Sequence, residues 1–279
     1  MDETWEAPAK VNLSLQVRPP DETGFHPIRS LVQAIEWCDA LELHLADEDR
    51  LEVHGDDLPV GPANLVWKGI EALSEHRPRL HMILRKTIPA GAGLGGGSSD
   101  AAAAIAAVGR FLSLGDEEMA AAASRTGADV PFFLKGGSAW IEGYGERVTP
   151  VPLVGGFAIA VVVPPFEMAT PEVYRRWDAL GGPEGPAISG NSLPPALRTH
   201  GPLRNDLTPA ATSVRPELGD WLAELTAEWG RPAFMSGSGS AIFGLFGDPD
   251  EASEAAQVKA ARASAGTELR QMGVARADR

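Results

Sequence analysis

A stretch rich in glycine and hydroxyl side chains has the composition of a phosphate site. The sequence PAGAGLGGGSSD, residues 89–100, holds five glycines and two serines and is followed by a run of alanines. A helix that begins directly after such a turn offers unpaired backbone N–H groups and a partial positive charge, and glycines let a ligand approach the backbone closely. These features predict a phosphate-binding turn. Its predicted members are Pro89, Ala90, Gly91, Ala92, Gly93, Leu94, Gly95, Gly96, Gly97, Ser98 and Ser99.

Three other structures are built from similar glycine-rich sequences. A flexible linker seldom lies between a strand and a strong helix. A Walker A loop needs a lysine directly after its last glycine, and Ser98 follows Gly97 here. Gly91, Gly93 and Gly96 match the dinucleotide pattern G-x-G-x-x-G, but the downstream segment is predicted as helix rather than as a strand that ends in an acid. The context therefore favours a phosphate turn of another type.

Strands and helices in both halves of the chain must position this turn. Apolar alternation predicts strands, and apolar residues at helical spacing predict helices. The predicted strands are 11–17, 30–37, 41–46, 80–86, 137–143, 146–151, 157–163 and the two arms of 233–246; the predicted helices are 62–76, 98–112, 116–125, 170–180, 217–230 and 248–265. Residues 180–202 are predicted as a long loop. We therefore predict two α+β domains, residues 1–152 and 153–279.

Composition narrows the classes of partner. The chain has 279 residues and a formal net charge of −14, which disfavours non-specific binding to nucleic acid or to an anionic membrane surface. The single cysteine, Cys38, cannot form an intramolecular disulfide, and the acidic N-terminal sequence does not resemble a signal peptide. No apolar run approaches the roughly 20 residues of a membrane span. We expect a cytoplasmic protein that binds small molecules; the sequence does not indicate its oligomeric state.

The glycine-rich turn resembles the phosphate loop of the GHMP kinases, which include galactokinase, homoserine kinase and mevalonate kinase. Three further stretches resemble the branch that phosphorylates CDP-methylerythritol: APAKVNLSL at 7–15, TGADVPFFLKGGSAWIEGYGE at 126–146 and MSGSGSAIF at 235–243. The resemblance implies phosphate transfer from ATP to the tertiary 2-hydroxyl of this substrate, in non-mevalonate isoprenoid biosynthesis. It also implies an N-terminal ATP-binding α+β domain, a ferredoxin-like C-terminal α+β domain and an active site in the cleft between them.

The resemblance implies two catalytic residues. Asp129 would accept the proton of the attacking hydroxyl, and Lys10 would pair with Asp129 and contact the attacking oxygen. A cation at this position favours the ionised carboxylate and stabilises developing negative charge; the alternative is a buried ion pair that holds the sheet. Asn12, two residues from Lys10 along a strand, is expected on the same face, where it would bind sugar hydroxyls.

The resemblance also implies a site for the cytidine diphosphate. Gly24, Phe25 and His26 lie where the family holds cytosine, so the base would stack between Phe25 and Tyr174, and His26 would bond its edge. Phe25 stands where the family commonly has tyrosine, and Tyr174 stands where phenylalanine is often found; Tyr174 could instead be a core contact of its helix. The remaining implied substrate residues are Thr170, Gly237, Ser238 and Gly239.

The implied nucleotide site takes ATP with Mg²⁺. Asn64, Leu65 and Lys86 would line the adenosine pocket, although Lys86 could also be a solvated lysine at the end of a strand. Ser98, or its neighbour Ser99, would ligate the Mg²⁺. Asn205 and Asp206 are interpreted as structural anchors of a loop.

Two other functions remain open from the sequence. Another small-molecule kinase of the family, acting on homoserine or mevalonate, would not need aromatic residues for a base. A nucleotide-binding regulator without catalysis would not need both Lys10 and Asp129.

Overall fold

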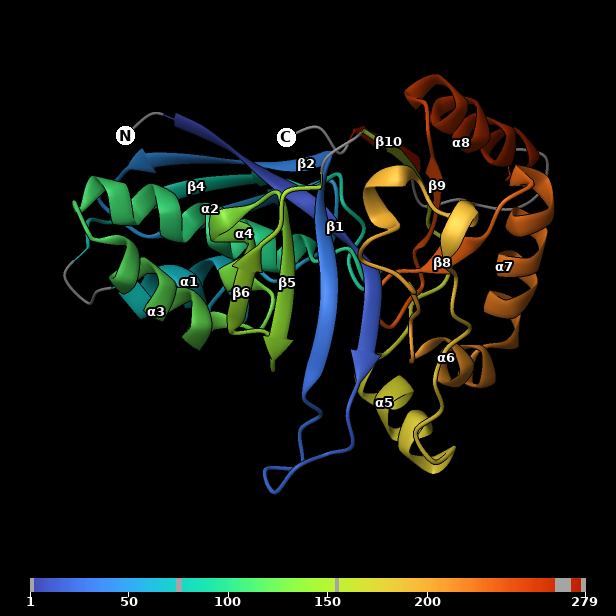
Figure 1. Ribbon diagram of the computed structural model, residues 1–279. Helices are drawn as coiled ribbons and strands as arrows, with labels where there is room; N and C mark the ends of the chain where they lie inside the picture. The colour runs from blue at the N-terminus through green and yellow to red at the C-terminus, as the bar shows by residue number, and fades with distance from the viewer. Residues whose placement is uncertain (1–2, 74–76, 154–155, 264–271, 277–279) are drawn as a thin grey trace. The chain divides into compact units, whose positions relative to one another are not determined.

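The structure is a computed structural model and describes residues 3–73, 77–153, 156–263 and 272–276 (Figure 1). The chain forms two compact units. The first unit comprises Met1–Ala9, Trp37–Ala90 and Gly95–Gly136, and the second comprises Lys10–Glu36, Gly91–Leu94 and Gly137–Arg279. Two long strands, β1 (Glu3–Val17) and β2 (Ile28–Leu45), pair with each other and contribute residues to both units. The domain division at residues 152 and 153 stays a prediction.

The first unit combines a small sheet with four helices. The second half of β2 pairs antiparallel with β4 (Leu80–Arg85), which pairs parallel with β3 (Arg50–His54). The helices are α1 (Leu65–Leu73), α2 (Gly96–Phe111), α3 (Asp116–Thr126) and α4 (Val130–Lys135).

Small residues let α1 and α2 pack closely. A Cβ atom added to Gly69 would lie 3.1 Å from Ile105 Cγ1 and 3.2 Å from Ala101 O. The alanines of α2 are buried for the same reason, because they add little width to the helix that follows the glycine-rich turn.

The second unit contains an antiparallel four-stranded sheet in the order β10-β7-β9-β8. Its strands are β7 (Ala158–Val162), β8 (Ala233–Met235), β9 (Ile242–Phe246) and β10 (Met272–Arg276). When these four strands are numbered along the chain, their order across the sheet is 4-1-3-2. This order confirms the ferredoxin-like topology. The helices are α5 (Thr170–Ala179), α6 (Thr208–Val214), α7 (Pro216–Trp229) and α8 (Pro249–Ala263). Helix α8 packs on β7 and α7 packs on β8 (Figure 1).

A hairpin completes the second unit. The first half of β2 pairs antiparallel with β5 (Ser138–Gly143), which pairs with β6 (Arg147–Pro150). In the four-stranded sheet, every residue of β7 and β9 is buried, as expected for strands whose sequences, AIAVV and IFGLF, are apolar throughout.

The structure corrects part of the predicted element map. Residues 30–37 and 41–46 were predicted as separate strands, but both belong to β2, because no glycine or proline interrupts the chain between them. Strand β3 and helices α4 and α6 were not predicted; each has seven residues or fewer. The predicted loop 180–202 includes two 3₁₀ turns, Gly190–Ser192 and Pro195–Leu197. The predicted helical residues 74–76 and 264–265 lie outside the described residues.

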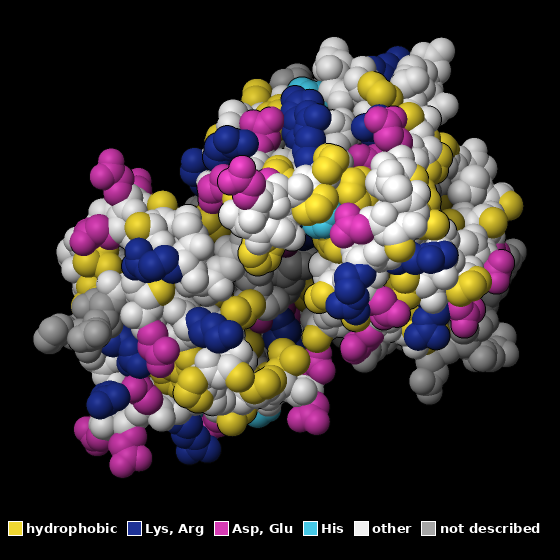
Figure 2. All heavy atoms as spheres, turned by 90° about the horizontal axis from the view of Figure 1, so that it is seen from below, with side chains coloured by type: hydrophobic (Ala, Val, Ile, Leu, Met, Phe, Trp, Pro, Cys, Tyr) yellow, Lys and Arg dark blue, Asp and Glu magenta, His cyan; other side chains and the backbone are white. Residues whose placement is uncertain are grey.

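The surface and the helices add two observations. On the face drawn in Figure 2, lysine and arginine side chains alternate with aspartate and glutamate rather than forming a continuous basic field. Among the helices that the structure describes, none is both long enough and apolar enough to span a bilayer.

Candidate active site

The middle of the glycine-rich turn is held by two other segments of the second unit. Ala92 O accepts a hydrogen bond from Ala241 N at 3.0 Å, and Leu94 O accepts one from Lys10 N at 2.9 Å. Gly93 has φ +78°, and a Cβ atom there would lie only 2.5 Å from Ser236 O. Only glycine fits this position, since a side chain would meet both backbone strain and a carbonyl oxygen.

Lys10 and Asn12 lie on the same face of β1, as the two-residue spacing predicted. Lys10 Nζ donates a hydrogen bond to Asn12 Oδ1 at 2.6 Å, and both residues are buried. Asn12 Nδ2 donates to Ser30 Oγ at 2.8 Å, which fixes the orientation of the amide. Asn12 N donates to Ser236 Oγ at 3.2 Å, and Ser236 Oγ donates to Gly93 O at 3.0 Å. One serine hydroxyl therefore joins β1, the glycine-rich turn and the second glycine turn.

The second glycine turn connects β8 and β9 and is anchored by Asn205. Asn205 Nδ2 donates to Met235 O and to Gly237 O, both at 2.8 Å. Asp206 accepts from the backbone nitrogens of Val17 and Gly185 at 3.0 and 3.1 Å. These bonds confirm the structural interpretation of Asn205 and Asp206.

Two of the predicted substrate residues meet at this turn. Thr170 Oγ1 and Ser238 Oγ lie 2.7 Å apart, so the first residue of α5 contacts the turn. Gly237 and Gly239 both have positive φ, +57° and +94°, a backbone conformation that glycine adopts readily.

The aromatic residues predicted to hold a base contact other rings of the second unit. The Phe25 ring is 69% exposed, and its ring contact is with Tyr144, at 6.2 Å between centroids. The His26 ring lies 5.1 Å from the Tyr174 ring and edge-on to Trp177 at 5.4 Å. His26 is therefore enclosed by aromatic residues of α5, while Phe25 presents its ring to solvent.

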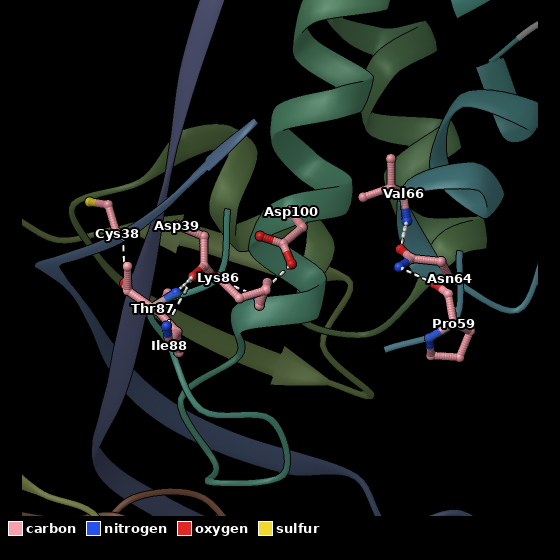
Figure 3. Close-up of polar contacts among 9 residues, drawn as sticks. All are labelled: Cys38, Asp39, Pro59, Asn64, Val66, Lys86, Thr87, Ile88 and Asp100. Carbon is pink, nitrogen blue, oxygen red and sulfur yellow. Dashed lines mark hydrogen bonds and ion pairs between the residues drawn. The ribbon is translucent and has the colours of Figure 1, made fainter. Parts of the chain in front are cut away.

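Lys86 lies in the first unit between two carboxylates (Figure 3). Its Nζ donates to Asp100 Oδ2 at 2.6 Å and also to Asp39 Oδ2, and all three side chains are buried. The other Asp39 oxygen accepts the backbone N–H groups of Thr87 at 2.5 Å and Ile88 at 2.9 Å. Asp39 thus anchors the chain just before the glycine-rich turn, and Lys86 links this point to the start of α2. A solvated Lys86 is excluded.

The buried cluster of Asp39, Lys86 and Asp100 shifts the pKa values of Lys86 and Asp100. Burial raises the pKa of Asp100 to about 7; the Asp39 carboxylate adds to this rise, and Lys86 opposes it. Burial alone would lower the pKa of Lys86, but the Asp100 and Asp39 carboxylates raise it. Asp39 and Asp100 were not among the site residues predicted from sequence. The available signal was an acid in an otherwise apolar strand and another inside an alanine-rich helix.

Two buried oxygens at the start of α2 fit a phosphate group or a cation. Ser99 Oγ and Asp100 Oδ1 have no hydrogen-bond partner within the residues that the structure describes, and leaving a buried polar atom unpaired costs about 1–3 kcal/mol. A hydroxyl can donate to a phosphate oxygen or ligate Mg²⁺. Ser98, the predicted Mg²⁺ ligand, is half-buried. Within the described ranges no three His, Cys, Asp or Glu residues are grouped to hold a metal ion.

The remaining predicted residues lie at helix starts of the first unit. Asn64 Oδ1 accepts from Val66 N at 3.0 Å, which caps α1, and Asn64 Nδ2 donates to Pro59 O at 2.8 Å. Leu65, the first residue of α1, is half-buried. Asp129, also half-buried, directly precedes α4, whose sequence carries Pro131 in its first turn.

Comparison with known proteins gives concordant matches. Residues 64–137 match the GHMP kinases N terminal domain, and residues 191–263 match the GHMP kinases C terminal domain. The chain is 36% identical over 268 residues to 4-diphosphocytidyl-2-C-methyl-D-erythritol kinase of Saccharopolyspora erythraea, covering 89% of this chain and 84% of the relative. The enzyme of that name from Geobacter sulfurreducens is 36% identical over 268 residues, with 93% and 95% covered.

A solved structure is similar over the full length. The crystal structure of a 4-(cytidine 5′-diphospho)-2C-methyl-D-erythritol kinase matches with a TM-score of 0.79 and 34% identity, covering 98% of each chain. This match and the two domain matches confirm the predicted two-domain α+β fold class.

Proposed function

The chain belongs to the 4-diphosphocytidyl-2-C-methyl-D-erythritol kinases of the GHMP kinase family, and on this premise we propose how its residues carry out the reaction. The substrate's tertiary 2-hydroxyl oxygen forms a bond to the γ-phosphorus of ATP. The bond from this phosphorus to the oxygen of the departing ADP breaks, and the hydroxyl proton passes to a carboxylate. Such a transfer requires positioning and charge stabilisation more than covalent chemistry.

One observation carries the proposal. Lys10, Asn12, the turn at 91–94 and Ser236 are joined by direct hydrogen bonds, although up to 224 residues separate them in sequence. Three of the motifs that resemble the family in sequence, at 7–15, in the glycine-rich turn and at 235–243, thus contact one another within the second unit. A buried cation and an oriented amide beside two glycine turns can bind the oxygens of phosphates and of a sugar alcohol.

We assign the nucleotide to the glycine-rich turn and its neighbours. Residues 89–99 bind the ATP phosphates through backbone N–H groups and serine hydroxyls, and Asn64, Leu65 and Lys86 line the side of the nucleoside. The hydroxyl of Ser98 or Ser99 would hold the Mg²⁺ that accompanies ATP, and this ion would supply positive charge to the phosphates. The orphaned Ser99 Oγ supports this assignment.

We assign the acceptor substrate to the second unit. Asn12 binds the methylerythritol hydroxyls, and Thr170 with Gly237, Ser238 and Gly239 binds the diphosphate. Phe25, His26 and Tyr174 hold the cytosine ring. The exposed ring of Phe25 supports this role, since it offers a free aromatic face.

Asp129 acts as the general base, and Lys10 stabilises the negative charge that develops on the attacking oxygen. The lone cysteine of the sequence agrees with a reaction in the reducing cytoplasm.

An assay of ADP release tests the function. Purified protein would receive ATP, Mg²⁺ and CDP-methylerythritol, with homoserine and mevalonate in parallel reactions. We expect turnover of the CDP substrate alone, and a loss of about 10²–10⁴-fold in Asp129→Asn with the fold retained. Turnover of another alcohol would overturn the substrate assignment, near-normal turnover in Asp129→Asn would remove Asp129 as base, and ATP binding without turnover would favour a regulator.

A further inference from the structure

Asp39 is a buried acid to which the proposed reaction assigns no role. It lies in β2, and its side chain is 0% exposed, so it does not contact a bound ligand directly. One of its oxygens accepts the backbone N–H groups of Thr87 at 2.5 Å and Ile88 at 2.9 Å, and the other accepts Lys86 Nζ (Figure 3). A single carboxylate therefore binds three consecutive residues, through charge-assisted hydrogen bonds that are stronger than those between neutral groups.

These bonds begin where the backbone pairing of β2 with β4 ends. The last pair of the two strands is Ala40 with Arg85, so Asp39 and Lys86 are next in register. After Arg85 the chain runs to Pro89, the first residue of the glycine-rich turn. Its backbone N–H groups need other acceptors there, and the Asp39 side chain supplies one. Asp39 thus fixes the point at which the chain enters the turn.

The same cluster holds the residues with which the chain leaves the turn. Lys86 Nζ donates to Asp100 Oδ2 at 2.6 Å, near the start of α2. A Cβ atom added to Gly96, the first residue of α2, would lie 3.1 Å from Ile88 Cγ2 and 3.2 Å from Lys86 Nζ. The entry to the turn and its exit therefore pack against each other within the first unit. Asp39 binds the entry directly and the exit through Lys86.

We propose that Asp39 is a positioning residue for ATP, because it holds both ends of the glycine-rich turn in the conformation that binds the phosphates without touching the nucleotide. The inference rests on the proposed function. A turn whose ends are already fixed does not have to be ordered by its ligand, so more of the interaction free energy becomes affinity. An acid with a purely structural role would change stability alone, whereas a positioning residue also changes ATP affinity in protein that remains folded.

The experiment compares wild type, Asp39→Asn and Asp206→Asn in steady-state kinetics with ATP and CDP-methylerythritol. Asp206 is the matched control, because it is a buried acid of the second unit that also accepts two backbone N–H groups. In Asp39→Asn we expect KM for ATP to rise at least about tenfold, with KM for CDP-methylerythritol within about twofold of wild type. In Asp206→Asn we expect an unchanged KM for ATP. Urea unfolding measures the stability that each variant has lost.

Two further measurements make the test independent of how well Asp39→Asn folds. Asp39→Glu keeps the negative charge beside Lys86 but moves the carboxylate by one methylene group, so KM for ATP should rise in this variant as well. Hydrogen exchange of wild type without ATP should show that the backbone N–H groups of Thr87 and Ile88 are already protected. Protection that appears only after ATP is added would overturn the proposal, because the ends of the turn would then not be preformed.

The outcomes separate this inference from the proposed function. If wild type phosphorylates CDP-methylerythritol and both Asp39 variants keep the wild-type KM for ATP, the inference fails alone. An equal rise in KM for ATP in Asp206→Asn would also overturn it, because the loss of any buried acid would then have the same effect.

If wild type shows no turnover, the proposed function fails, and calorimetric titration with ATP tests the inference directly. Binding that is at least about tenfold weaker in Asp39→Asn than in wild type would support it. Equal binding by the two proteins, or no binding of ATP by wild type, would overturn it.

Discussion

Each unit of the protein buries a lysine beside part of the glycine-rich turn, and the two lysines have different surroundings. Lys86 in the first unit donates to two carboxylates, Asp39 and Asp100. Lys10 in the second unit donates to a neutral amide oxygen of Asn12. The ion pairs of Lys86 join charges within the first unit, whereas the bond from Lys10 to Asn12 belongs to a set of hydrogen bonds that joins several segments of the second unit.

This contrast sets the structural role of the Lys86 charge against the catalytic role proposed for Lys10. Two buried carboxylates hold Lys86 in place, and Asp39 also binds backbone N–H groups just before the turn. Removing the lysine leaves those carboxylates uncompensated. The Asn12 amide, which accepts from Lys10, also donates to Ser30 and so keeps a hydrogen bond when Lys10 is replaced. Substitution of Lys86 should therefore act mainly on stability, and substitution of Lys10 mainly on turnover.

The largest effect is expected in Lys86→Met. The change leaves Asp39 and Asp100 buried without their cation, which should lower the free energy of unfolding by about 3–5 kcal/mol. Urea unfolding at pH 7 measures it, with the exposed Lys68→Met as control. Recovery of part of this loss in Lys86→Met combined with Asp100→Asn would support the explanation, and an unchanged unfolding midpoint in Lys86→Met would contradict it.

The next effect is expected in Lys10→Met, which keeps the apolar stem of the side chain and removes its charge. We predict a fall in kcat of about 10²–10³-fold, since the stabilising charge at the attacking oxygen is lost. Steady-state kinetics at saturating substrates measure kcat, and a thermal melt checks the fold. A melting temperature that falls with kcat, as in Lys86→Met, would erase the distinction between the lysines.

A smaller effect is expected on the pH dependence of the free energy of unfolding, through Asp100 of the first unit. Because burial raises the pKa of Asp100 to about 7, the folded state binds a proton more tightly than the unfolded state. This contribution is present in full below the unfolded pKa near 4 and is lost as pH rises through about 7. The free energy of unfolding should therefore fall by about 2 kcal/mol between pH 5 and 7. Urea titrations of wild type and Asp100→Asn check this, and an equal fall in both would reject the role of Asp100.

The smallest effect is expected in Ser236→Ala. Its hydroxyl joins Asn12 N to Gly93 O, and its loss leaves buried backbone groups with one bond fewer, at a cost of about 1–2 kcal/mol. Urea unfolding measures the cost, and exposed Ser189→Ala is the control. We also expect KM for ATP to rise, because the hydroxyl holds the turn. A change equal to that of the control would show that this junction contributes nothing.

Part of this site could be predicted from sequence, because it depends on residues that are close to one another along the chain. The run of glycines followed by serines and alanines predicted a turn that leads into a helix, and α2 begins at Gly96 within that run. The spacing of two between Lys10 and Asn12 predicted a shared face, because side chains alternate along a strand. Both predictions depend only on backbone geometry within a few residues. The family resemblance added the ferredoxin-like topology of the second domain and the reaction.

Partners distant in sequence could not be predicted in the same way. An acid within the apolar stretch around Asp39 gives no indication that it binds Lys86 and the chain before the turn, 47–49 residues away. The His26 ring likewise contacts Tyr174 and Trp177 of α5, and no local pattern around residue 26 predicts these partners.

By itself, the sequence determined a glycine-rich turn that leads into a helix, the polar face of β1 and the two-domain α+β class, because glycine freedom, strand alternation and helix periodicity are local properties. Only the tertiary structure decided that Ser236 joins two glycine turns, that Lys86 is enclosed by carboxylates and that Asp178 faces His26. These contacts arise when burial brings polar groups together and each must find a partner or a ligand. Local residue spacing does not encode which distant partner that will be.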